Sequence, residues 1–134
     1  MIVVVDTSAL LRLFIPDGPI PAGLTRALRE AERGEGALLA PELILPEAAQ
    51  VLRKKYREGI LSREEMDELL ECILSLPIKL FGHRALIRRA SALAREENLT
   101  VYDSLFLALA EAKNGRLLTA DRALEKAAEK LELL

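Results

Sequence analysis

Three aspartates occur where a strand-like apolar run gives way to a helical pattern, or where such a helix begins: Asp6, Asp103 and Asp121. A fourth acid, Glu47, lies on the apolar side of a helical pattern, where an unpaired carboxylate is costly to bury. Acids at the carboxyl ends of parallel strands can converge at one sheet edge. Because converging carboxylates repel one another unless a cation holds them, the pattern predicts a divalent metal site and the phosphate chemistry that such metals support.

Helix capping is the alternative explanation for each aspartate taken alone, since Asp is a favoured N-cap residue. Capping does not explain Glu47, nor why two of the caps directly follow buried strands at the same sheet edge. The hydroxyls of Ser8 and Thr119 are close in sequence to Asp6 and Asp121. They are interpreted either as groups that orient a carboxylate or a metal-bound water, or as ordinary turn and cap hydroxyls.

Other chemistries find little support in the sequence. It has no glycine-rich phosphate loop and no Gly-x-Ser-x-Gly elbow. A single histidine, His83, and a single cysteine, Cys72, have no partners at ligand spacing and are interpreted as structural. A phosphoaspartate enzyme would also place an aspartate at a strand end, but Asp6 lacks the second acid two residues on that phosphatases of the haloacid-dehalogenase type use.

The alternation of strand and helix patterns predicts an α/β domain with right-handed crossovers and a parallel sheet buried on both faces. The expected strands are residues 2–5, 37–40, 77–81, 116–119 and 131–134. The expected helices are residues 7–15, 19–33, 42–57, 62–75, 83–97, 103–113 and 122–130. With 134 residues and no linker or internal repeat, we expect one domain over residues 1–134.

The net charge of −2 argues against a protein held to nucleic acid by bulk electrostatics. Basic clusters at residues 53–57 and 84–89 are interpreted either as local contacts to RNA or as solvated helix faces. No apolar run approaches the ~18 residues of a membrane span, and no basic segment precedes the first apolar run. We therefore expect a cytoplasmic protein that does not bind membranes, and the scarcity of amide side chains suggests a thermophilic source.

Four segments resemble the four acidic motifs of PIN domains, in the same order and over the whole length of the chain. They look most like the motifs of the VapC-like toxin ribonucleases of bacterial and archaeal toxin–antitoxin pairs. The segments are Asp6-Thr7-Ser8, Pro46-Glu47 with the following Ala-Ala-Gln-Val-Leu-Arg-Lys, Tyr102-Asp103-Ser104-Leu105-Phe106-Leu107-Ala108-Leu109-Ala110, and Leu118-Thr119-Ala120-Asp121-Arg122-Ala123-Leu124.

The resemblance implies a fold, a site and partners. The fold would be a three-layer sandwich, with a five-stranded parallel sheet in the order 3-2-1-4-5 between helices, and the protein would form a homodimer. The activity would be hydrolysis of RNA, inhibited by a cognate antitoxin protein. The acids that would hold Mg²⁺ or Mn²⁺ and carry out catalysis are Asp6, Glu47, Asp103 and Asp121, supported by Thr119 and Ser8.

Two other functions remain open within the same resemblance. One is a housekeeping PIN nuclease that processes RNA or cleaves structured DNA. The other is a PIN-fold binding module without catalysis. A small antitoxin-like reading frame upstream would favour the toxin over the housekeeping nuclease, whereas failure to bind metal would favour the binding module.

Overall fold

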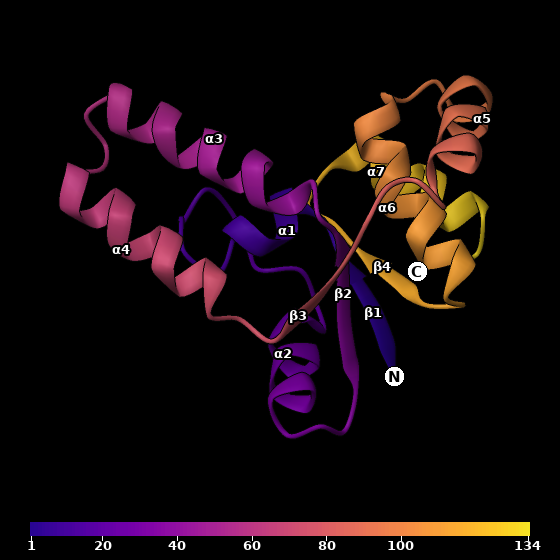
Figure 1. The fold of residues 1–134 in the computed structure, drawn as a ribbon, viewed down its shortest axis with the longest axis horizontal. Helices are drawn as coiled ribbons and strands as arrows, with labels where there is room; N and C mark the ends of the chain where they lie inside the picture. The colour runs from indigo at the N-terminus through magenta and orange to yellow at the C-terminus, as the bar shows by residue number, and fades with distance from the viewer.

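The computed structural model describes residues 1–134 as a parallel sheet flanked by helices. Helices α5, α6 and α7 lie together on one side of the sheet, and α3 and α4 extend as a hairpin on the other (Figure 1). The strands are β1 (Ile2–Val5), β2 (Ala37–Pro41), β3 (Ile78–Phe81) and β4 (Arg116–Leu118). The helices are α1 (Thr7–Leu11), α2 (Leu24–Glu32), α3 (Ile44–Arg57), α4 (Arg63–Leu74), α5 (Ile87–Glu97), α6 (Val101–Ala112) and α7 (Arg122–Lys130).

The sheet has four strands in the order β3-β2-β1-β4, all of them parallel. Strand β1 is therefore central, with Val4 paired to Leu39 of β2 on one side and to Leu117 of β4 on the other. This arrangement confirms the α/β prediction and the order of the first four strands. It also places the residues that follow β1 and β4 next to each other at the carboxyl edge of the sheet.

The expected fifth strand, residues 131–134, does not form. After α7 the chain enters the left-handed region at Glu132 (φ 58°), and the N–H groups of Glu132 and Leu133 donate back to Glu129 O and Ala128 O of the helix. These two bonds are those of a Schellman motif, which uses the amide groups that a β ladder would need. Only one backbone bond joins this segment to β4, from Leu117 N–H to Leu133 O.

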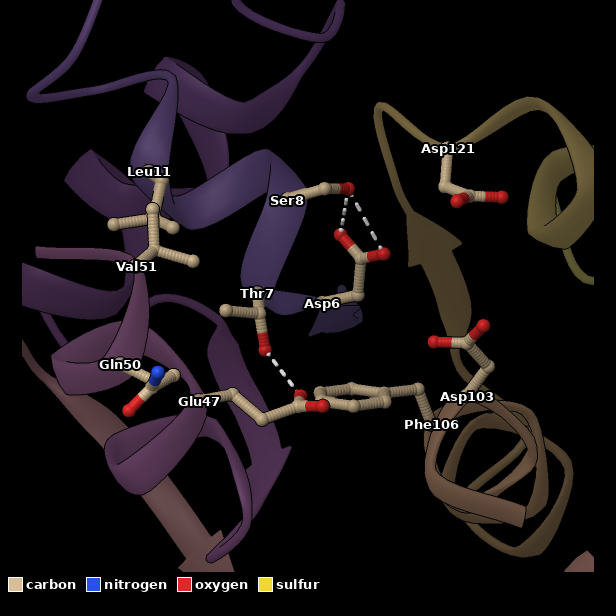
Figure 2. Close-up of a pocket in the computed structure, with 10 residues that line it drawn as sticks. All are labelled: Asp6, Thr7, Ser8, Leu11, Glu47, Gln50, Val51, Asp103, Phe106 and Asp121. Atoms are coloured by element: carbon tan, nitrogen blue, oxygen red, sulfur yellow. Dashed lines mark hydrogen bonds between the residues drawn. The ribbon is translucent and has the colours of Figure 1, made fainter. Parts of the chain in front are cut away.

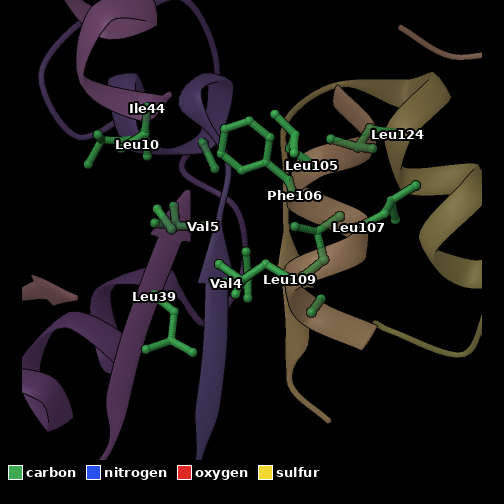
Figure 3. Packing of buried hydrophobic residues seen from close by; sticks show 14 of the residues in the cluster. Val4, Val5, Leu10, Leu39, Ile44, Leu105, Phe106, Leu107, Leu109 and Leu124 are labelled. Atoms are coloured by element: carbon green, nitrogen blue, oxygen red, sulfur yellow. The ribbon is translucent and has the colours of Figure 1, made fainter. Parts of the chain in front are cut away.

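Helix α6 forms the centre of the core. All seven residues from Ser104 to Ala110 are buried, as expected for a helix that is apolar on nearly every side. Its leucines and Phe106 belong to one hydrophobic cluster with Val4 and Leu39 of the two central strands, and Figure 3 shows Leu109 of α6 beside Val4 of β1. Burying one such side chain contributes about 1.5–3 kcal/mol, so the start of α6 is held firmly against the sheet.

Helices α2 and α5 begin several residues later than the sequence patterns predict. Helix α2 starts at Leu24 and not at 19, because Pro19 and Pro21 precede it and Gly23 occupies the left-handed region (φ 90°). Helix α5 starts at Ile87 and not at 83. No helix of the structure is both long enough and apolar enough to span a membrane.

Candidate active site

All four predicted acids line one pocket of about 380 Å³ at the carboxyl edge of the sheet. Four different elements deliver them: Asp6 follows β1, Asp121 follows β4, Glu47 lies on α3 and Asp103 on α6. Figure 2 shows Asp6, Asp103 and Asp121 around one side of the pocket, with Glu47 across from Asp121. The predicted convergence is therefore present in the structure.

Asp6 is the most firmly held of the four acids, with only 4% of its surface exposed. It is the N-cap of α1 and accepts a hydrogen bond from Ala9 N–H at 2.9 Å. The hydroxyls of Ser8 (2.8 and 3.0 Å) and Thr119 (2.6 Å) also donate to its carboxylate. The capping explanation is thus correct for Asp6, but a cap alone does not require two further hydroxyl donors.

Ser8 and Thr119 join the ends of β1 and β4. Ser8 Oγ accepts a hydrogen bond from Ala120 N–H at 3.0 Å, and its oxygen lies 3.3 Å from Thr119 Oγ1. Thr119 Oγ1, which donates to Asp6, also accepts from Asp121 N–H at 3.0 Å. The two hydroxyls therefore connect the backbone before Asp121 to the Asp6 carboxylate.

Asp121 is the N-cap of α7, where its Oδ1 accepts from Leu124 N–H at 2.9 Å. Unlike Asp6, it is exposed. Its second carboxylate oxygen has no protein donor, so that oxygen is available to a ligand in the pocket.

Glu47 has the partner that its place on the apolar side of α3 required. Its side chain is half-buried, and Thr7 Oγ1 donates to Glu47 Oε1 at 2.7 Å. The bond spans 40 residues and links the first turn of α1 to α3. One oxygen of Glu47 is therefore held by the protein and the other is left to the pocket.

Asp103 lies inside the first turn of α6, so the expected start of this helix at 103 and the N-cap explanation for Asp103 are both wrong. The N-cap is Thr100, whose Oγ1 accepts from Asp103 N–H at 3.0 Å. Since Thr100 satisfies the free amide of this turn, the Asp103 carboxylate has no capping role and is free to face the pocket.

The electrostatics of the pocket disfavour four ionised acids. Burial raises the pKa of Asp6 to about 6, although the hydrogen bonds from Thr119, Ala9 and Ser8 act to lower it. Burial, followed by the charge of Asp121, raises the pKa of Asp103. None of the four carboxylates takes part in a salt bridge. The protein therefore gathers negative charge here without supplying a cation of its own.

Carboxylate oxygens are the ligands that hard divalent cations prefer, so the donor set suits Mg²⁺ or Mn²⁺. No three of the acids are close enough together to enclose an ion as they stand. An ion held by one or two carboxylates, with water completing its coordination, agrees with this spacing and with the preference of Mg²⁺ for retained water.

Comparison with known proteins agrees with this architecture. The family model for the PIN domain matches residues 3–130. The chain belongs to the PIN-domain family. Ribonuclease VapC3 of Pyrobaculum aerophilum is 35% identical to this PIN domain over 126 residues, and the match covers 92% of each chain.

Two solved structures resemble this PIN domain over nearly its whole length. PAE2754, also from Pyrobaculum aerophilum, matches with a TM-score of 0.72 and 26% identity, covering 96% of this chain and 90% of its own. VapC20 of Mycobacterium tuberculosis, a toxin that cleaves the sarcin–ricin loop, matches with a TM-score of 0.64 and 17% identity. That second match covers 93% and 94% of the two chains and concerns the fold alone.

Sequence reasoning missed several residues of the pocket in this PIN domain, among them Gln50 on α3 and Phe106 on α6. Each lies three residues after an acid, Gln50 after Glu47 and Phe106 after Asp103, and this spacing on a helix places them on the same face. Helical spacing from the acids was thus the signal that could have identified them.

His83 is structural, as predicted, and lies outside the pocket. Its Nε2 accepts a hydrogen bond from Leu43 N–H at 3.1 Å. Leu43 is the N-cap residue of α3, so His83 holds the beginning of the helix that carries Glu47.

Proposed function

We propose that this PIN domain is a Mg²⁺- or Mn²⁺-dependent endoribonuclease and the toxin component of a VapBC-like toxin–antitoxin pair. The observation that carries the proposal is the convergence of four unneutralised carboxylates in one pocket. Similarity to Ribonuclease VapC3 over 92% of each chain supports RNA as the substrate. The cation follows from the donor chemistry, because these acids have no cationic partner in the protein.

We assign Asp6 and Asp103 as direct ligands of the cation, and Glu47 and Asp121 as residues that hold water or accept a proton. In support, the fold holds Asp6 most firmly, and Glu47 and Asp121 each keep one oxygen without a protein donor. Ser8 and Thr119 act through Asp6 and are positioning residues. When bound, the cation would polarise a phosphodiester oxygen and lower the pKa of an attacking water.

Hydrolysis then follows an in-line course. The water oxygen bonds to phosphorus as the bond from phosphorus to the 3′ oxygen breaks, and a carboxylate of the pocket takes the water proton. The 3′ oxygen takes a proton from solvent, so the products carry a 5′-phosphate and a 3′-hydroxyl. Because burial and a neighbouring acid raise the pKa values of Asp6 and Asp103, proton transfer belongs to the group and not to a single residue.

The proposed partners are an antitoxin and a second copy of the chain. The acidic pocket is a target for an antitoxin Arg or Lys, which would neutralise the carboxylates and displace the cation. The α3–α4 hairpin exposes Tyr56, Ile60 and Leu74, and such apolar side chains suit an amphipathic partner helix or a homodimer contact. Light scattering of the purified chain, alone and with the product of an upstream reading frame, tests both associations.

A cleavage assay tests the activity. Total RNA and transfer RNA are incubated with the protein in Mg²⁺, in Mn²⁺ or in EDTA, with Asp6→Asn as the inactive variant and Asp67→Asn as the matched control. Asp67 is exposed on α4 and forms no salt bridge. Cleavage that needs metal and Asp6 supports the proposal, whereas equal cleavage by wild type and Asp6→Asn contradicts the site.

Two further results would favour the alternative functions. Harmless expression in a host cell of an enzyme that is active and soluble would favour a housekeeping nuclease. Failure to bind metal would favour a binding module without catalysis.

A further inference from the structure

A groove extends from the acidic pocket along the loop that follows α1. The pocket shares Ser8, Leu11 and Val51 with a smaller hollow of about 160 Å³. That hollow shares Arg12 with a groove of about 740 Å³, which runs past residues 19–22 and the end of β4. Thr119 and Ala120 line the groove, so it passes directly beside Asp121. The open surface is thus continuous from the carboxylates to the groove.

Arg12 is a half-buried cation without a protein partner. Its guanidinium forms no salt bridge and no side-chain hydrogen bond. It lies against Gly18, which has no side chain to occupy the place of the guanidinium. The nearby Asp17 does not neutralise Arg12, because Asp17 pairs with Lys55 at 3.1 Å. A partly buried charge of this kind is stabilised when an anion binds beside it.

Arg122 supplies a second cation to the same groove, directly after Asp121. It is exposed and forms no salt bridge. The single acid among the groove residues is Glu125. The groove therefore carries excess positive charge and begins at a pocket that carries excess negative charge.

We propose that this groove binds the RNA strand on one side of the scissile phosphate, with Arg12 and Arg122 contacting its backbone phosphates. The inference rests on the proposed function and adds a substrate-binding site to it. Guanidinium groups bind phosphate in a bidentate manner, and a cationic groove of this kind follows a single strand without reading its sequence. The apolar residues Pro19, Ile20 and Pro21 give the bases a surface against which to pack.

The groove also resolves a problem of charge. An acidic pocket alone repels the backbone of RNA, and the chain has a net charge of −2. Two cations beside the pocket attract the phosphates next to the scissile one, while the carboxylates and their cation act on the scissile phosphate itself. Substrate attraction and catalysis are thereby assigned to neighbouring but separate groups.

The test compares Arg12→Gln, Arg122→Gln and the double variant with wild type. Binding of a single-stranded RNA oligonucleotide is followed by fluorescence anisotropy at several salt concentrations, in EDTA so that the strand is not cut. Each lost phosphate contact should reduce the slope of log K against log salt by about 0.7. In cleavage with Mn²⁺, the double variant should raise KM by about tenfold and leave kcat within about twofold.

Two controls separate charge from folding. Arg33→Gln removes one exposed cation between α2 and β2, outside the groove. Its RNA affinity and salt slope should match those of wild type. Arg12→Lys keeps the charge and should retain most of the salt slope that Arg12→Gln loses. Melting temperatures of all the variants check that the fold is intact.

The outcomes distinguish the inference from the function on which it rests. If wild type cleaves RNA with metal but the double variant keeps the wild-type KM and salt slope, the groove does not bind RNA and only the inference fails. In that case, binding of a partner peptide that does depend on Arg12 and Arg122 would assign the groove to protein recognition. If wild type neither binds nor cleaves any RNA, the proposed function fails as well.

Discussion

On the strand side of the pocket, at the ends of β1 and β4, Asp6 accepts hydrogen bonds from Thr119, Ser8 and Ala9 N–H. On the helix side, formed by α3 and α6, Glu47 accepts a single bond from Thr7. The strand side is buried around Asp6, whereas Glu47 and Asp103 are half-buried. The sheet therefore preorganises the acids of the strand side, whereas the positions of Glu47 and Asp103 on the helix side depend on how α3 and α6 are placed.

The largest expected effect is on catalysis, and it should differ between the two sides. Asp6→Asn should lower kcat by about 10³-fold and Glu47→Gln by about 10²-fold, because Asp6 is the more rigidly positioned acid. Initial rates with Mn²⁺ on a defined RNA substrate measure both. A larger loss of kcat for Glu47→Gln than for Asp6→Asn would contradict the claim that the strand side is the more rigidly positioned.

The second effect is on stability, and it depends on pH. The pKa of Asp6 is about 6 in the folded protein against an ordinary value of 3.8. Between these values the folded state binds more protons than the unfolded chain, so stability falls as pH rises. Above about pH 6 the full destabilisation, of about 3 kcal/mol, is present in the metal-free protein.

Asp6→Asn removes this titration and should gain stability relative to wild type as pH rises from about 4 to 7. Urea unfolding in EDTA at several pH values measures the difference in unfolding free energy. Asp103→Asn should show a smaller change of the same sign, since burial and Asp121 also raise its pKa. A difference that stays constant with pH for Asp6→Asn would contradict the burial of its charge.

The third effect is stabilisation by metal. A cation bound only by the folded state adds about 2.7 kcal/mol at a hundredfold excess over Kd. Mn²⁺ should therefore raise the melting temperature at neutral pH, and the gain should shrink near pH 4 as the acids become protonated. Asp6→Asn should lose most of the gain, Glu47→Gln less of it and Asp67→Asn none. Equal responses from all three variants would mean that the metal binds elsewhere.

The smallest effect distinguishes the two threonines that support the acids. Thr119→Val removes the shortest of the hydrogen bonds to the buried Asp6 carboxylate and should cost about 1.5–3 kcal/mol, and it should raise the pKa of Asp6 further. Thr7→Val affects a half-buried bond and should cost about 0.5–1.5 kcal/mol. Thermal unfolding of both variants at pH 7 tests the order, and a reversed order would weaken the distinction between the two sides.

Local signals were enough to predict the strand side of the site. Val3–Val5 and Leu117 belong to short apolar runs that read as buried strands, and parallel strands bring their carboxyl ends to one edge. The strand order that the resemblance implies, with the first strand next to the fourth, then places Asp6 close to Asp121, and the pairing of β1 with β4 confirms it. Ser62 and Glu65 form a capping box at the start of α4, and their Ser-x-x-Glu spacing is an equally local signal.

The helix side could not be predicted as fully. The bond from Thr7 to Glu47 joins residues 40 positions apart, and no local pattern encodes it. The prediction began this helix at residue 103, because Thr100, Val101 and Tyr102 favour strands. In the structure Thr100 is the N-cap of α6, and Val101 and Tyr102 are its first two residues. The segment 131–134 was misread for a related reason: its leucines suit a strand or a helix end equally well.

The hydrogen bond from Leu43 N–H to His83 Nε2 gives the protein a built-in spectroscopic probe. His83 is the only histidine of the chain, so its imidazole contributes a single set of ring signals to an NMR spectrum. A neutral ring is required, because Nε2 can accept only while it carries no proton. Leu43, the donor of this bond, lies four residues before Glu47 at the start of α3. The ring signals would therefore report any movement of α3 when metal, RNA or an antitoxin reaches the helix side of the pocket.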